Sequence, residues 1–103
     1  MTMAEVHEII DIAMQVNGLS KRDREFTGDL PTVMIYMHGH IACLEIDIHD
    51  HGWNNNLSDR DFYFYTNEPC NEAEFDNYKT YMKELLERCP QPSEVPNEQK
   101  QEE

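Results

Sequence analysis

Four of the five histidines in this 103-residue chain form two H-x-H pairs, His38/His40 and His49/His51. Imidazole nitrogens bind zinc, and an H-x-H pair on a strand places two imidazoles on one side of the sheet. A zinc site needs three or four ligand atoms about 2.0–2.3 Å from one ion. The two pairs, however, flank a predicted strand that keeps them about 30 Å apart, at roughly 3.3 Å per residue. The sequence therefore predicts no shared metal site and no cofactor.

A partial metal site remains an alternative at the second pair, where carboxylates are close in the sequence: Asp47, Asp50, Asp59 and Asp61. Such a grouping is typical of adventitious metal binding. We interpret both pairs as loop histidines at the two ends of the sheet, and His7 as a helix-surface residue.

The chain also offers thiols as nucleophiles: Cys43, Cys70 and Cys89. Their odd number and wide spacing indicate neither a disulfide framework nor a zinc knuckle. Cys43 is expected near Glu45, and an acidic neighbourhood raises a thiol pKa, which opposes activation. Cys70 precedes a predicted helix, but no histidine is near it to act as a base. No phosphate-binding loop, dinucleotide fingerprint or hydrolase motif occurs, so the residues predict a protein that is not an enzyme.

Charge is the most informative property of the chain, which has 21 acidic and 8 basic residues and a formal net charge of −13. Such a surface repels phosphate backbones and anionic membranes, and it attracts a basic protein in a salt-dependent way. We therefore expect no direct nucleic-acid binding and no membrane binding. The chain shows neither a signal peptide nor a membrane-spanning run, which favours a cytoplasmic location.

Two amphipathic helices are predicted. Residues 2–17 begin with a capping box formed by Thr2 and Glu5, and they carry one apolar stripe. The second helix begins at Asn71, whose side chain can cap the first turn, and runs to about Cys89. Residues 19–31 read as a polar connection between the first helix and the strands.

Three strands are predicted between the helices. Residues 32–37 and 42–49 alternate apolar and polar side chains and form a hairpin, and residues 61–66 supply an aromatic third strand. A two-residue turn at Gly39 and His40 would pair Ile35 with Leu44 and would pair Val33 with Ile46.

These elements predict an α+β fold: a three-stranded antiparallel sheet with both helices packed on one face. Residues 1–89 would form a single domain. Residues 90–103 have no apolar periodicity, so we expect a disordered acidic tail.

The sheet face without helices is the predicted interaction surface. It would present Met34, Tyr36, Cys43, Glu45, Asp47, Tyr63 and Tyr65. Carboxylates pair with guanidinium groups and tyrosine rings stack on them, so this face suits a groove rich in Arg and Lys. The candidate partner-binding residues are Glu45, Asp47, Tyr63 and Tyr65, together with Asp50 and Trp53 in the following loop. Alternatively, Trp53 folds back over the sheet edge, and the acidity serves only solubility.

The stretches "VMIYMHGHIACLEIDIHDHGW" and "DFYFYTNE", with the acidic helix that follows, resemble small orphan proteins of phages and prophages of Gram-positive bacteria. The resemblance covers roughly residues 31–88. The helix, three strands, helix plan and the strong acidity are also similar to some type II anti-CRISPR proteins, which block Cas9 at its PAM-reading or nucleic-acid-binding surfaces. The resemblance implies a stoichiometric inhibitor of a Cas nuclease in the bacterial cytoplasm.

Other functions fit the same sequence. An immunity protein or antitoxin that caps a basic nuclease toxin would need equal acidity. A histidine-dependent metalloprotein and a phage accessory protein of unknown role are further alternatives. A homodimer joined through exposed strand edges is another.

Overall fold

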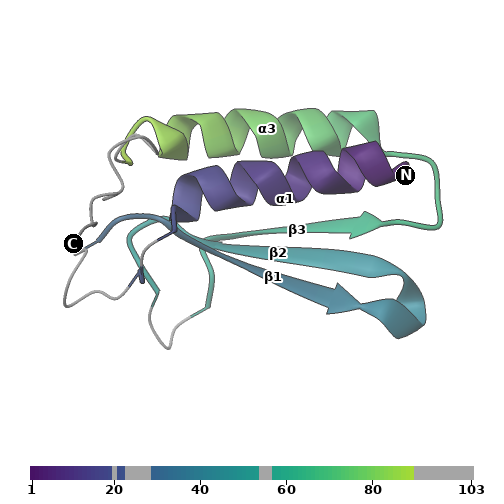
Figure 1. Ribbon diagram of the computed structural model, residues 1–103, viewed down its shortest axis with the longest axis horizontal. Coiled ribbons are helices and arrows are strands. Elements are labelled where there is room, and N and C mark those ends of the chain that lie inside the picture. The colour runs from purple at the N-terminus through teal and green to yellow at the C-terminus, as the bar shows by residue number, and fades with distance from the viewer. Residues whose placement is uncertain (20, 23–28, 54–56, 90–103) are drawn as a thin grey trace, which may run out of the picture.

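The computed structural model describes residues 1–19, 21–22, 29–53 and 57–89. Its elements in chain order are α1 (Met3–Asn17), β1 (Thr32–His38), the short 3-10 turn η1 (Gly39–Ile41), β2 (Cys43–His49), β3 (Arg60–Tyr65) and α3 (Glu72–Leu86). The strands form an antiparallel sheet in the order β1-β2-β3, and both helices cover the same side of it (Figure 1). The predicted α+β fold is therefore confirmed.

Both helices begin where the sequence predicts. The backbone N–H of Glu5 donates to the Thr2 hydroxyl over 3.1 Å, and the N–H of Thr2 donates to the Glu5 carboxylate over 2.7 Å. Asn71 caps α3 by accepting a hydrogen bond from the N–H of Glu74 over 3.1 Å. These bonds satisfy backbone donors that have no partner within the helix. Helix α3 ends at Leu86, three residues before the predicted end at Cys89.

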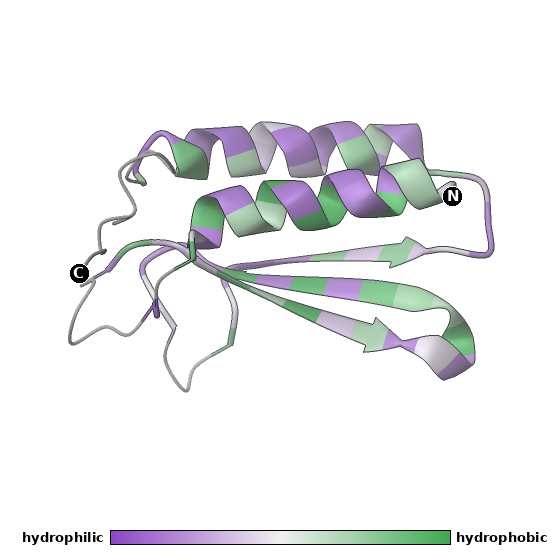
Figure 2. Ribbon diagram, in the orientation of Figure 1, coloured by the Kyte–Doolittle hydropathy of each residue, from purple (hydrophilic) through white to green (hydrophobic). Residues whose placement is uncertain are grey.

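The core lies between the helices and one face of the sheet. Its fully buried members come from both layers: Ile9, Val16, Ile46, Ile48, Phe62, Tyr78 and Met82. Figure 2 shows apolar and polar residues alternating along β2, the pattern expected of a strand with one buried face. The buried Tyr78 hydroxyl donates to the Ile9 carbonyl over 2.8 Å, which joins the two helices without leaving a polar atom unpaired.

The predicted register of the hairpin is wrong. Ile35 lies opposite Ile46, and Val33 lies opposite Ile48. The two strands are joined by the four residues 39–42 in place of a two-residue turn, and the loop closes with Ala42 in the left-handed region at φ 51 and ψ 50. The observed and predicted registers place the same side chains on each face, because they differ by an even number of residues.

Helix α1 runs diagonally across the sheet. At its start, the amino group of Met1 donates to the carbonyls of Thr66 and Glu68, just beyond β3. At its end, the Asn17 amide donates to the Val33 carbonyl over 2.9 Å and accepts from the Val33 N–H over 2.8 Å. The helix therefore begins beside the end of β3 and finishes at the outer edge of β1.

Parts of the predictions lie outside the described residues: the acidic tail 90–103, and residues 20 and 23–28 of the polar connection. Within the described ranges, no helix has the length and apolar character needed to span a membrane.

Candidate functional site: the open face of the sheet

We call the sheet side that faces away from the helices the open face. Side chains alternate along each strand, so its members follow from the register: Thr32, Met34, Tyr36, His38, Cys43, Glu45, Asp47, His49, Asp61, Tyr63 and Tyr65. Tyr36, Tyr63 and Tyr65 are each exposed over more than 40% of their surface. The structure thus brings together four of the six predicted partner-binding residues on one surface.

Three carboxylates occupy adjacent positions at the centre of this face. Asp47 of β2 lies opposite Asp61 of β3, and Glu45 lies two residues from Asp47 on the same strand. The N–H of Asp59 donates to the Ile48 carbonyl over 2.8 Å, so Ile48 directs its backbone groups toward β3. Its neighbour Asp47 therefore forms a non-hydrogen-bonded pair with Asp61, the closer type of cross-strand pair, in which like charges repel. We call Glu45, Asp47 and Asp61 the carboxylate cluster.

The repulsion within the carboxylate cluster changes its protonation. Burial raises the pKa of Asp47, and the neighbouring Glu45 and Asp61 raise it further, from 3.8 to about 7. The Oδ1 atom of Asp47 is buried and has no hydrogen-bond partner within the described part of the chain. Glu45, burial and Asp61 also raise the pKa of the Tyr63 phenol across the sheet. The open face thus carries crowded carboxylates at adjacent strand positions.

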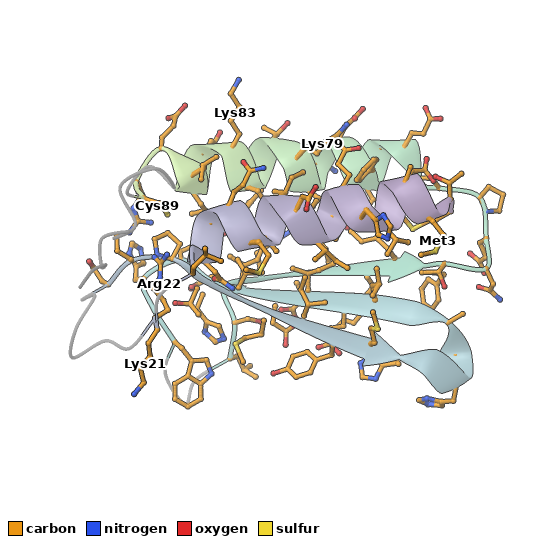
Figure 3. The ribbon with its side chains drawn as sticks, in the orientation of Figure 1. Met3, Lys21, Arg22, Lys79, Lys83 and Cys89 are labelled. Carbon is orange, nitrogen blue, oxygen red and sulfur yellow. The ribbon has the colours of Figure 1, made fainter. Side chains whose placement is uncertain are left out.

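The three strands place no Lys or Arg side chain on this face. Arg60 projects toward the helices, with its guanidinium carbon 4.4 Å from the centre of the Phe62 ring. The remaining described basic residues lie in the connection after α1, on α3 or just after it: Lys21, Arg22, Lys79, Lys83 and Arg88 (Figure 3). Strand alternation places two histidines on the open face, His38 and the buried His49, and Nε2 of His38 lies 2.8 Å from Oε1 of Glu45.

Sequence reasoning missed Asp61 and His38 as members of the site. Asp61 alternates with Tyr63 and Tyr65 along the third strand, so the same two-residue period that selected the tyrosines could have included it. The hydroxyl of Ser58 donates to its Oδ1. His38 was assigned to the turn, whereas it is the last residue of β1.

Asp50 does not belong to the open face. Its two carboxylate oxygens accept from the Tyr81 hydroxyl over 2.6 and 2.7 Å, and its carbonyl accepts from Arg88 over 2.9 Å. Burial and Asp50 together raise the pKa of Tyr81. These bonds tie the loop after β2 to α3, so the Asp50 carboxylate is engaged within the fold.

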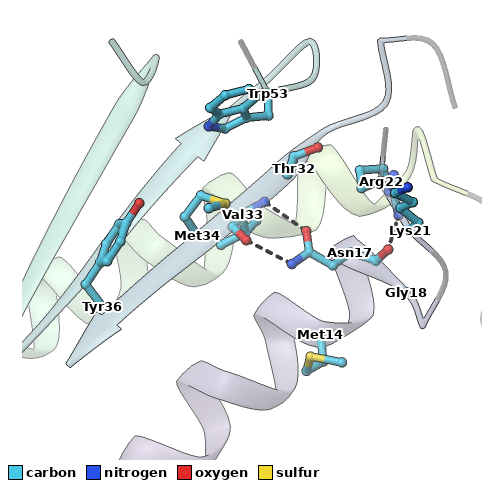
Figure 4. A pocket seen from close by; sticks show the side chains of 10 residues that line it. All are labelled: Met14, Asn17, Gly18, Lys21, Arg22, Thr32, Val33, Met34, Tyr36 and Trp53. Carbon is cyan, nitrogen blue, oxygen red and sulfur yellow. Dashed lines mark hydrogen bonds between the residues drawn. The ribbon is translucent and has the colours of Figure 1, made fainter. Parts of the chain in front are cut away.

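Trp53 lies beside the start of β1, where it lines a groove of about 780 Å³ (Figure 4). The other groove residues come from the end of α1, the following connection and β1: Met14, Asn17, Gly18, Lys21, Arg22, Thr32, Val33, Met34 and Tyr36. The indole is 47% exposed. The groove adjoins the open face at Met34 and Tyr36. Because the Trp53 ring is half exposed, a partner can reach it.

The histidine pairs lie near the two ends of β2, but two of the four differ from the prediction, because His38 ends β1 and His49 ends β2. His49 is a strand residue, 6% exposed and paired with Thr32, and is therefore not a loop histidine. In the described ranges, no group of three or more His, Cys, Asp or Glu residues is arranged to hold a metal ion.

The described cysteines lie in different surroundings. Cys43 is on the open face, opposite His38 and Tyr65 in the register, but it is only 4% exposed, so its predicted exposure is wrong. Burial, Glu5 and Glu72 raise the pKa of the Cys70 thiol. A raised pKa lowers the thiolate fraction at neutral pH.

No protein-family model, curated protein or solved structure matches this chain.

Proposed function

We propose that this chain is a stoichiometric inhibitor whose open face binds a basic, nucleic-acid-binding surface of a Cas nuclease. The observation that carries the proposal is the carboxylate cluster, which lies at the centre of a face where the described strands carry no Lys or Arg. A guanidinium or ammonium group from a partner would pair with the carboxylates of the cluster and relieve the repulsion among them.

The tyrosines around the cluster support a protein partner rich in arginine. Tyr36, Tyr63 and Tyr65 flank the carboxylates with exposed rings. Arg stacks on aromatic rings while its guanidinium pairs with a carboxylate, and this combination is common at protein interfaces. The face therefore offers the two kinds of contact that a groove lined with Arg can use. A binding function, without catalysis, is proposed for it.

The choice of a Cas nuclease as the partner rests on the resemblance to anti-CRISPR proteins in plan and charge. Capping a basic nuclease toxin, as an immunity protein or antitoxin does, would use the same face. The two functions differ in the identity of the partner, so the partner must be tested directly.

The test measures binding of the purified chain to Cas9, with and without guide RNA, together with DNA cleavage. We expect binding and inhibition by the wild-type chain. The double variant Glu45→Gln/Asp61→Asn keeps the side-chain shapes but removes two charges from the open face. At about 1 kcal/mol for each lost charge pair, it should bind about 30-fold more weakly.

The matched control is Asp11→Asn/Glu84→Gln, which removes the same two kinds of charge from exposed positions on the helices. It should bind like the wild type. Equal weakening of both double variants would mean that net charge, and not the open face, governs binding. If Cas9 binds in neither state, the Cas assignment is wrong, and capture from host lysate then tests the nuclease-toxin alternative.

A further inference from the structure

The outer edge of β1 is uncharged, although 28% of the chain is charged. The strand reads TVMIYMH and contains neither Lys, Arg, Asp, Glu nor Pro. Edge strands of monomeric proteins normally carry charges, prolines or bulges, because unpaired backbone groups otherwise recruit another strand. This edge lacks those features.

Hydrogen bonding divides the edge into a capped part and a free part. The Asn17 side chain holds both backbone groups of Val33, so Val33 directs them away from β2. Backbone groups alternate in direction along a strand, and Ile35 and Met37 must therefore also direct theirs outward. Neither residue makes a backbone hydrogen bond on that side within the described part of the chain. The strand then ends at η1, which begins at Gly39. The free edge is thus the segment 35–37.

The structure assigns this edge to a second copy of the chain. In an antiparallel pairing about a two-fold axis at Tyr36, Ile35 of each copy lies opposite Met37 of the other, and Tyr36 lies opposite its own equivalent. This register uses the free N–H and C=O groups of Ile35 and Met37 in both copies, which makes four hydrogen bonds. The capped Val33 then lies opposite Gly39, where the other strand has ended, so Asn17 need not move. Such self-complementarity is what a two-fold interface requires.

Exposed apolar side chains gather where the second copy would lie. Helix α1 crosses the sheet diagonally and leaves the hairpin end of β1 uncovered, so Met37 is 71% exposed although it is on the helix side. Ile41 in η1 is 51% exposed. The proposed register brings the end of the other copy's α1, with its exposed Met14, beside this region. Pairing would therefore cover apolar surface from both copies.

Charge favours a second copy over a basic partner at this edge. The segment 35–37 contains no carboxylate that could attract a basic partner. Two copies of the chain, each of net charge −13, repel each other at a distance. Raising the salt concentration screens that repulsion, so dimerisation should strengthen with salt. Binding of a basic partner at the open face should weaken with salt, and the two interactions are thereby separable. The dimer does not depend on the proposed function.

Sedimentation equilibrium tests the proposal at about 0.05 M and about 0.5 M salt. We expect the wild-type chain to reach the mass of two 12.2 kDa chains, with a lower Kd at the higher salt. Met37→Lys places a charge on the edge and should sediment as a single chain. Leu57→Lys adds the same charge at a 93% exposed residue outside β1 and should dimerise like the wild type. A single-chain mass for the wild type at every salt concentration would overturn the proposal, as would a dimer that survives Met37→Lys.

Two cysteine variants test the register of the proposed dimer without adding a charge to β1. In a Cys70→Ser background, Tyr36→Cys places two thiols directly opposite each other in a non-hydrogen-bonded pair, with Cβ atoms about 4.5–5.5 Å apart and close to disulfide reach. Mild oxidation should then yield a covalent dimer. Met34→Cys is the matched control, because its thiol lies opposite His38 of the second copy and should stay unlinked. Cross-linking of both variants, or of neither, would contradict the two-fold pairing at Tyr36.

Discussion

Replacing Asp47 with Asn should stabilise the fold at alkaline pH and leave its stability nearly unchanged in acid. The Asn side chain keeps the size of the carboxyl group and removes its titration. Since the pKa of Asp47 rises from 3.8 to about 7 on folding, the folded state favours the protonated form. The stabilisation from that form is complete below about pH 4 and is lost as the pH rises toward 7.

The size of the effect follows from the pKa shift and from solvent screening. A shift of about 3 pKa units corresponds to about 4 kcal/mol if it is fully expressed in the free energy of unfolding. The open face is in contact with solvent, which screens the charges, and like charges at opposed strand positions cost about 0.2–1 kcal/mol each. With two carboxylate neighbours, Glu45 and Asp61, we expect Asp47→Asn to be about 1–2 kcal/mol more stable than the wild type at pH 8.

Urea denaturation of both proteins at pH 5 and pH 8 provides the assay, with the free energy of unfolding compared at each pH. Comparing the variant with the wild type at one pH cancels the titration of carboxylates outside the carboxylate cluster. Asp11→Asn, an exposed helix residue, is the control and should show no such pH dependence. A difference between Asp47→Asn and wild type that is equal at the two pH values would refute the crowding argument.

Three further results are expected. Asn17→Ala removes both hydrogen bonds to Val33 and should lower the free energy of unfolding by about 1–2 kcal/mol in urea titrations; no loss would mean that the helix end is held by other contacts. Ala42→Gly removes the strain of an alanine in the left-handed region at φ 51. It should raise the free energy of unfolding by about 0.5–1 kcal/mol, seen as a higher melting temperature. A partner cation should lower the pKa of Asp47, so affinity measured by calorimetry should rise about tenfold from pH 6 to pH 8. Asp47→Asn should abolish that pH dependence.

The elements of the fold could be predicted because their signals are local. Thr2 and Asn71 mark the helix starts with capping side chains, and strict alternation marks the strands. The hairpin register could not be predicted, because it depends on Ala42 adopting a left-handed conformation that alanine rarely takes. Glycine at position 39 pointed instead to a two-residue turn.

The site was predictable to the extent that strand alternation determines it. Glu45 and Asp47 share a face with Tyr63 and Tyr65, as the two-residue period requires. The position of Asp50 was not predictable, because its carboxylate is held by Tyr81, which lies 31 residues away in the chain. Long-range contacts of that kind leave no pattern in the surrounding sequence.

The open face can be tested most directly by measuring the affinity of the Glu45→Gln/Asp61→Asn variant for Cas9 against that of Asp11→Asn/Glu84→Gln. Measured at pH 8, where Asp47 is largely ionised in the wild type and in both variants, the two variants carry the same net charge, so the comparison isolates where the charge lies. We expect about 30-fold weaker binding for the open-face variant and wild-type binding for the helix variant. Indistinguishable affinities for the two variants would contradict the assignment of the open face as the binding surface.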